Sequence, residues 1–116
     1  MNTDPDCIFC KIVRGEIPAI EVFRDADVVA FRDLNPQAPE HVLVIPTEHA
    51  PNLSAFARTA SAHAAQRLLQ VCGETGAALG PQGYRVVANE GAHGGQTVHH
   101  LHVHVLAGRA MTWPPG

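Results

Sequence analysis

The stretch of this sequence richest in chemically active side chains is His99-His100-Leu101-His102-Val103-His104, in which histidines recur at alternate positions. In a β-strand, alternate side chains point to one face, so His100, His102 and His104 are predicted to project together. Three imidazoles in a row are poorly explained as packing, because burying their ring nitrogens without partners is costly. The spacing therefore predicts a site of imidazole chemistry.

Two kinds of chemistry fit these histidines. They are suited to bind a catalytic metal as neutral imidazoles, or to form a metal-free site in which one imidazole attacks phosphorus. The preceding segment favours the second kind, because Gly91, Gly94 and Gly95 allow close backbone approach to an anion. Gln96 and Thr97 add neutral hydrogen-bonding groups at the entrance to the strand. Together these residues predict a phosphate cradle beside the imidazoles.

A second group has the residue types that bind zinc. Cys7 and Cys10 are separated by two residues. This spacing favours metal or redox chemistry over a disulfide, and a reduced pair beside a short helix is the alternative. His49 follows a predicted strand, and His99 is predicted to face away from the other three histidines. Two cysteines with two histidines are typical of a structural zinc site, which would tie the N-terminal segment to the sheet.

The elements that must position these groups are predicted from apolar periodicity and from turn residues. The pattern indicates an α+β fold with a five-stranded antiparallel sheet, one long helix and a short N-terminal helix. The short helix is expected at residues 8–13 and the long one at 57–79. Strands are expected at 20–23, 28–31, 41–45, 84–88 and 99–106, the first two forming a hairpin. The prolines of 35–39 and the glycines of 89–96 predict loops, and the tail at 111–116 has no regular pattern.

Length and composition limit the class of protein. A chain of 116 residues is expected to form a single domain, here 1–116. The formal net charge of −3 gives no basic patch, so nucleic acid is not an expected partner. There is no run of about 18 apolar residues and no cationic segment leading into an apolar one, so we expect no membrane partner and a cytoplasmic location.

The run His100-Leu101-His102-Val103-His104-Val105-Leu106 resembles the signature of the histidine triad (HIT) family, and other stretches resemble its Hint branch, the purine nucleoside phosphoramidases. Those stretches are DLNPQAP at 33–39, HVLVIP at 41–46, NEG at 89–91, GGQ at 94–96 and WPPG at 113–116. The resemblance extends from about Cys7 to the last residue. Two departures are Thr97, where serine is common, and Ala107, where glycine is usual.

The resemblance implies a homodimer in which two five-stranded sheets join into one of ten strands. It also implies hydrolysis of the P–N bond of purine nucleoside 5′-phosphoramidates, with aminoacyl-adenylates as a further substrate class. His102 would attack the α-phosphorus to form a nucleotidyl-histidine that water then resolves, without a cofactor for catalysis.

Further roles follow from the resemblance, position by position. His104 would contact the phosphate, His100 would orient and polarise the nucleophile, and His41 would support both. Asp33 would hold the ribose hydroxyls, and Trp113 would contact the leaving group in the partner's site. The purine slot would consist of Ile8, Phe9, Ile12, Phe31 and Leu34, and the polar residues around the phosphate would be Asn89, Gln96 and Thr97. Some bacterial members of the family carry a structural zinc.

Three alternatives stay open from the sequence. A dinucleoside polyphosphate hydrolase of the same superfamily would use the same nucleophile, although the WPPG ending favours the Hint branch. A regulatory purine-nucleotide-binding protein would use the same pocket without needing turnover. A metal-dependent hydrolase would use the three histidines as ligands.

Overall fold

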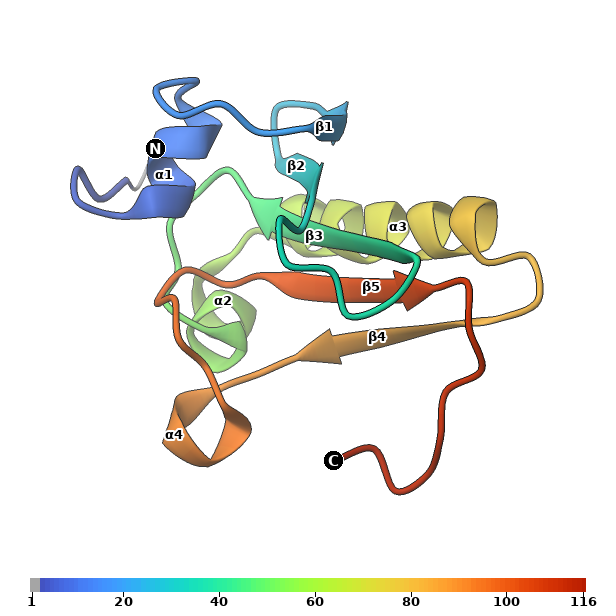
Figure 1. The fold of residues 1–116 in the computed structure, drawn as a ribbon. Coiled ribbons are helices and arrows are strands. Elements are labelled where there is room, and N and C mark those ends of the chain that lie inside the picture. Colours follow the sequence, from blue (N-terminus) through green and yellow to red (C-terminus); the bar gives the residue numbers. More distant parts are fainter. Residues whose placement is uncertain (1–2) are drawn as a thin grey trace.

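The computed structural model describes residues 3–116, and its α+β architecture confirms the predicted fold class (Figure 1). One antiparallel sheet has the strand order β1-β2-β3-β5-β4. The strands are β1 (Glu21–Arg24), β2 (Val28–Arg32), β3 (Glu40–Pro46), β4 (Tyr84–Ala88) and β5 (Val103–Ala107). The helices are α1 (Ile8–Val13), α2 (Leu53–Thr59), α3 (Ala62–Leu79) and α4 (Gly91–Gly94). Met1 and Asn2, which the single-domain prediction for 1–116 includes, lie outside the described residues.

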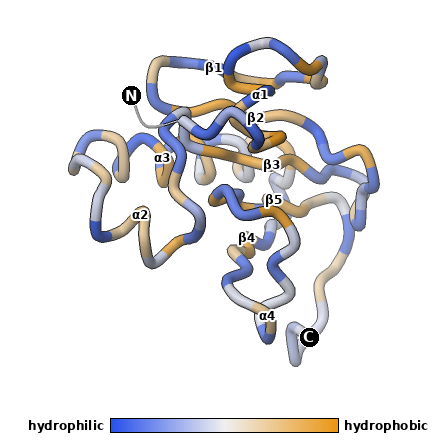
Figure 2. Tube along the Cα trace, turned by 90° about the vertical axis from the view of Figure 1, so that its left-hand side faces the viewer, coloured by the Kyte–Doolittle hydropathy of each residue, from blue (hydrophilic) through white to orange (hydrophobic). Residues whose placement is uncertain are grey.

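The central strand β3 separates two hydrophobic clusters, because alternate side chains of a strand point to opposite faces. Val42 and Val44 pack in the cluster beneath α3, which runs behind the sheet in Figure 1. Leu43 and Ile45 belong to the other cluster, which includes residues of α1. The sheet is therefore covered by α3 on one face and by α1 on the other. Figure 2 shows the hydrophobic colouring of β3 in the interior.

The hairpin of β1 and β2 forms as predicted, and its turn is held by Asp25. The Asp25 carboxylate accepts hydrogen bonds from the backbone N–H groups of Asp27 and Val28, both at 2.8 Å. An aspartate in this position stabilises a tight turn through its own backbone contacts. β2 then continues into a five-residue pairing with β3.

The helix predicted at 57–79 is two helices, α2 and α3, separated at Ala60 and Ser61. Ser61 has extended backbone angles, and its hydroxyl accepts a hydrogen bond from Ala64 N–H at 3.0 Å. Serine is a strong N-cap, so a new helix begins here although the flanking residues favour helix. Asn52 caps α2 in the same way, through Ala55 N–H. No helix in residues 3–116 has the length and apolarity to cross a membrane.

The strand predicted at 99–106 is shorter in the structure and lies at Val103–Ala107. The chain bends at 98–100 before entering β5. Leu101 N–H donates to Ala50 C=O at 2.8 Å, which is a contact to a loop and not to the sheet. Strand alternation therefore does not extend back to His99 and His100. The glycine-rich segment predicted as a loop also contains the single-turn helix α4.

Candidate active site and metal centre

Three histidines meet on the face of the sheet that α1 covers. His41 lies in β3, His104 in β5, and His102 immediately before β5. The Nε2 atom of His41 is 2.8 Å from Nδ1 of His104, and the ring centroids of His102 and His104 are 5.2 Å apart. His41 and His102 are buried and His104 is nearly so. The antiparallel pairing of β3 with β5 thus brings together imidazoles that are 63 residues apart.

A chain of hydrogen bonds determines which nitrogen of each ring carries hydrogen. The backbone N–H of Gln37 donates to Nδ1 of His41 at 3.0 Å, so this nitrogen must be an acceptor. Neutral His41 then carries its hydrogen on Nε2 and donates it to Nδ1 of His104. His104 in turn carries hydrogen on Nε2, a buried atom without a hydrogen-bond partner among residues 3–116. A buried donor of this kind is suited to a ligand oxygen.

The imidazole rings of His41 and His104 are both held in the neutral form. Burial lowers the pKa of His104 to about 4. Burial also lowers the pKa of His41, against the opposing influence of the Asp33 carboxylate. At neutral pH, His104 therefore offers a neutral N–H donor, and the direction of the whole chain from Gln37 is preserved.

The ring of His102 is oriented by a different contact. Its Nδ1 atom lies 2.8 Å from the backbone carbonyl oxygen of His100. Because a carbonyl only accepts hydrogen bonds, Nδ1 of His102 must carry hydrogen, which leaves the lone pair on Nε2. His102 thus offers a lone pair on Nε2, and His104 offers an N–H donor. Attack on an anionic centre requires both, a nucleophile and a donor that stabilises the charge.

These two histidines lie at the polar end of a cavity of about 310 Å³ between α1, β2 and the segment at 97–98. Its apolar wall includes Phe9, whose ring meets those of Phe31 and His102 edge to face at 5.6 and 5.2 Å. Nine of the residues predicted for the site line it: Ile8, Phe9, Ile12, Phe31, Asp33, Leu34, Thr97, His102 and His104. An apolar slot with a few convergent polar groups is typical of a small-molecule site.

Four residues predicted to contact substrate lie outside this lining in the described chain: Asn89, Gly95, Gln96 and Trp113. The side chain of Gln96 connects parts of the glycine-rich loop. Its amide donates to the carbonyls of Pro51 and Val98, and its oxygen accepts from Gly91 N–H at 3.2 Å. Trp113 is 82% exposed in the tail. Their roles toward substrate stay predictions.

The cavity also contains residues that the sequence reasoning missed. Leu43 lies two residues after His41 in β3 and therefore points to the same face of the sheet, so strand periodicity was a sufficient signal for its place in the cavity. Ile17 and Ala19 follow a turn at Gly15, where φ is +76°. Their place in the wall depends on how the chain returns from α1 toward β1, and no local pattern predicts that.

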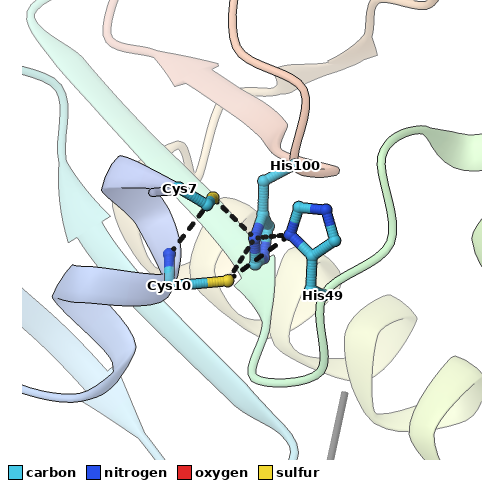
Figure 3. Close-up of side chains that lie close together, drawn as sticks. All are labelled: Cys7, Cys10, His49 and His100. Carbon is cyan, nitrogen blue, oxygen red and sulfur yellow. Dashed lines mark hydrogen bonds between the residues drawn. The ribbon is translucent and has the colours of Figure 1, made fainter. Parts of the chain in front are cut away.

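A second cluster lies beside the first and has the composition of a metal centre (Figure 3). It contains Cys7 and Cys10 from α1 and its N-cap, His49 from the segment after β3, and His100. The structure brings His100 into this cluster in place of the predicted His99, because the bend at 98–100 leaves the His99 side chain exposed and turns His100 inward. His100 is fully buried.

The distances within this cluster fit a tetrahedral ion. Nδ1 of His100 lies 3.4 and 3.5 Å from the sulfurs of Cys7 and Cys10. Nδ1 of His49 lies 3.2 Å from Nδ1 of His100. Usual zinc–ligand bond lengths in a tetrahedron give about 3.6 Å between nitrogen and sulfur and about 3.3 Å between two nitrogens. The donor set and spacing therefore fit Zn²⁺.

The ring of His100 has the orientation and the protonation state that a metal ligand requires. Its Nε2 atom donates to the carbonyl of Pro46 at 3.0 Å, so the Nδ1 lone pair faces the two thiols. Burial lowers the pKa of His100 to about 4, which keeps the ring neutral. Burial also raises the pKa of Cys10. A bound cation would oppose that rise by stabilising the thiolate.

A further group with ligand atoms within 4.8 Å consists of Asp33, His41 and His104. Here the inner ring nitrogens already share a hydrogen at 2.8 Å, and the outer nitrogen of His41 accepts from Gln37. A metal would have to displace these bonds. The geometry favours the nucleophile interpretation of this site over its use as a set of metal ligands.

Comparison with known proteins places this architecture among characterised folds. The HIT domain family matches residues 14–111. An uncharacterised HIT-like protein of Synechocystis sp. is 51% identical over 114 residues, covering 96% of this chain and 97% of the relative. The 14 kDa zinc-binding protein of Zea mays is 46% identical over 116 residues, covering 97% and 90%. The crystal structure of a HIT family hydrolase from Legionella pneumophila superposes with a TM-score of 0.89 at 44% identity, covering 96% of this chain and 100% of that one.

Proposed function

Because this chain belongs to the HIT domain family, we propose that it is a hydrolase of the Hint branch that cleaves the P–N bond of purine nucleoside 5′-phosphoramidates. The product is the nucleoside monophosphate, and aminoacyl-adenylates are a further substrate class. The observation that carries the proposal is the pairing of the His102 Nε2 lone pair with the His104 Nε2–H donor at the end of one apolar cavity. The description of the Legionella relative as a hydrolase supports it.

The reaction proceeds in two displacements at the α-phosphorus. Nε2 of His102 forms a bond to phosphorus while the P–N bond of the substrate breaks, and the leaving nitrogen takes up one proton from solvent and departs as the amine. Water then attacks phosphorus, the bond between phosphorus and His102 breaks, and one proton of the water returns to solvent. The sum is one phosphoramidate and one water giving one nucleoside monophosphate and one amine.

His104 stabilises the charge that builds up on the phosphoryl oxygens in both displacements. Its Nε2–H is already directed by His41, so little reorganisation is needed when the charge develops. The peptide N–H of Gln37 holds the start of this chain. Catalysis therefore depends on which nitrogen of each ring carries hydrogen, and not on a charged histidine.

The cavity supplies the nucleoside site in this proposal. Phe9, Ile12 and Phe31 offer an apolar slot for the base. One oxygen of the Asp33 carboxylate accepts from Asn35 N–H at 2.8 Å. The other oxygen lies 3.5 Å from Nε2 of His41 and would hold ribose hydroxyls at the rim. In this arrangement the carboxylate would bind the ribose hydroxyls, and the apolar slot would accept either adenine or guanine.

We also propose that the cluster of Cys7, Cys10, His49 and His100 holds a structural zinc. When bound, the ion would fix α1 against the segment that precedes β5. The zinc-binding description of the maize relative supports this assignment. Catalysis in the proposal needs no cofactor.

A homodimer completes the proposal. β4 is an edge of the sheet, and its Tyr84 and Val86 are 41% and 46% exposed. An exposed apolar edge strand is a template for pairing with another chain. Pairing of two β4 edges would give the ten-stranded sheet, with Trp113 reaching toward the partner's cavity.

Turnover of adenosine 5′-phosphoramidate tests the function. The protein is expected to release AMP, whereas His102→Ala is expected to bind AMP without turnover. If the parent protein binds AMP but releases none from the substrate, the regulatory nucleotide-binding alternative replaces the proposal. Cleavage of dinucleoside polyphosphates in preference to phosphoramidates would move the protein to the other branch of the superfamily.

A further inference from the structure

We infer that His100 is a positioning residue through which a metal in the neighbouring centre fixes the nucleophile His102. The inference rests on the proposed function for its catalytic consequence. It assigns the metal centre a role in selecting the reactive nitrogen of His102, in addition to any role in folding.

Three contacts make His100 a connection between the two sites. Its Nδ1 faces Cys7 and Cys10 at 3.4 and 3.5 Å, and its Nε2–H donates to Pro46 C=O. Its own carbonyl accepts from Nδ1–H of His102 at 2.8 Å. The same residue therefore holds the metal with its ring and the nucleophile with its backbone.

The carbonyl of His100 depends on these anchors because it lies outside the sheet. β5 begins at Val103, so the peptide between His100 and Leu101 is not part of the β3–β5 pairing. The neighbouring Leu101 N–H is held by a loop carbonyl, that of Ala50. A segment of this kind lacks the repeated hydrogen bonds of a strand, so it is held by individual contacts, among them the buried His100 ring and the buried Leu101 side chain.

Removal of the metal is expected to disturb this ring first. Two imidazole nitrogens 3.2 Å apart, His49 Nδ1 and His100 Nδ1, would then face each other across the space of the ion. Both rings would have to reorient or share a hydrogen. If the carbonyl of His100 moves as a result, Nδ1 of His102 loses its acceptor and the ring populates both tautomers. In the second tautomer Nε2 carries hydrogen and cannot attack phosphorus.

The base slot is expected to survive metal loss better than the nucleophile. The guanidinium of Arg24 donates to the carbonyls of Val13 and Ile12 at 2.9 and 3.2 Å, at the opposite end of α1 from the cysteines. Phe9 and Ile12 also remain packed in the cluster with Phe31. The inference therefore predicts that kcat falls while KM changes little.

The experiment compares zinc-loaded with zinc-free protein, labelled with ¹⁵N-histidine and observed by long-range ¹H–¹⁵N correlation at one fixed pH. The loaded protein is expected to show His102 as a single Nδ1–H tautomer. The zinc-free protein is expected to show averaged tautomers for His102, with the His41–His104 pair unchanged and near-UV circular dichroism retained. The loss in kcat is expected to be on the order of 10-fold, as for other residues that support a metal ligand or its neighbours.

Variants of His49 test the metal centre from a second ligand, because Nδ1 of this residue lies 3.4 Å from the Cys10 sulfur and 3.2 Å from Nδ1 of His100. His49→Asn is expected to lose zinc, the single tautomer and kcat together. His49→Cys restores a zinc-binding donor set and is expected to recover all three. His63→Asn, a change at an exposed histidine of α3, is the matched control and is expected to change none of them.

Two results overturn the inference: a folded zinc-free protein that keeps the single tautomer and its kcat, or a zinc-free protein that loses its tertiary structure and recovers it only together with the tautomer. The second would show a purely structural metal. Because the tautomer is measured without substrate, absence of phosphoramidate turnover by the loaded protein would refute the proposed function and leave this test intact.

Discussion

Replacement of His41 by alanine tests the hydrogen-bond chain that directs the phosphate-binding nitrogen of His104. In the intact protein, His41 Nε2–H donates to His104 Nδ1 at 2.8 Å, which leaves the hydrogen of His104 on Nε2. His41→Ala removes that donor and replaces none of the residues that line the cavity. His104 is then free to carry its hydrogen on Nδ1 and to present a lone pair to the phosphate.

The magnitude follows from the cost of an unsatisfied buried polar group, about 1–3 kcal/mol. At about 1.4 kcal/mol per tenfold change in rate, kcat/KM is expected to fall about 5- to 150-fold. The free energy of unfolding is expected to fall as well, because His41 is only 4% exposed and its removal leaves a cavity.

The assay is steady-state hydrolysis of adenosine 5′-phosphoramidate, with kcat and KM measured separately and urea unfolding monitored in parallel. His63→Ala, at an exposed histidine of α3, is the matched control and is expected to retain wild-type kinetics. A folded His41→Ala protein with kcat/KM within about twofold of wild type would refute the reasoning that orientation of the His104 hydrogen matters.

Three further predictions concern stability and assembly. Because burial lowers the pKa of His104 to about 4 from a usual value of 6.5, the unfolded chain binds a proton more readily, so stability is retained above about pH 6.5 and lost as pH falls toward 4. The loss of stability from His104 is at most about 3 kcal/mol. Urea unfolding of His104→Asn across this pH range should show an unfolding free energy that changes less steeply with pH than that of the parent protein. An equal dependence on pH would contradict the lowered pKa of His104. Gly76→Ala would place a Cβ 2.2 Å from the Tyr84 ring, and thermal unfolding should show a loss of about 1–3 kcal/mol, whereas an unchanged midpoint would mean that the Tyr84 ring turns aside without cost. Val86→Lys on the β4 edge should convert a dimer to a monomer in sedimentation velocity, and a monomeric parent protein would contradict the proposed ten-stranded sheet.

The parts of the fold that the sequence predicted well are those with strong local patterns. The continuous apolar run of β3, the Asp25 turn and the strand at Tyr84–Ala88 all follow from residue types within a few positions. The break between α2 and α3 was also locally encoded, in the Ser61 cap, but the many alanines around it indicated one continuous helix.

The errors at the site come from tertiary structure. His99 was predicted as a metal ligand by extending strand alternation beyond the point where β5 begins, and the bend there exchanges it for His100. The engagement of Gln96 with Pro51 likewise depends on a contact between segments 45 residues apart. The grouping of His102 and His104 was predictable because alternation holds from 102 into the strand. Its hydrogen-bond direction was not, since it depends on the Gln37 peptide in a loop that the sequence only marks as irregular.

Trapping of the covalent intermediate decides whether His102 carries the nucleotidyl group. The protein is mixed with excess adenosine 5′-phosphoramidate, quenched within milliseconds in alkaline denaturant and digested for mass spectrometry, because a phosphorus–imidazole bond is labile in acid. An adenylyl group is expected on the peptide that contains His102, located at that residue, with no adduct and no turnover in His102→Ala. An adduct on another residue, or a His102→Ala protein that turns over at the wild-type rate, would contradict this role of His102.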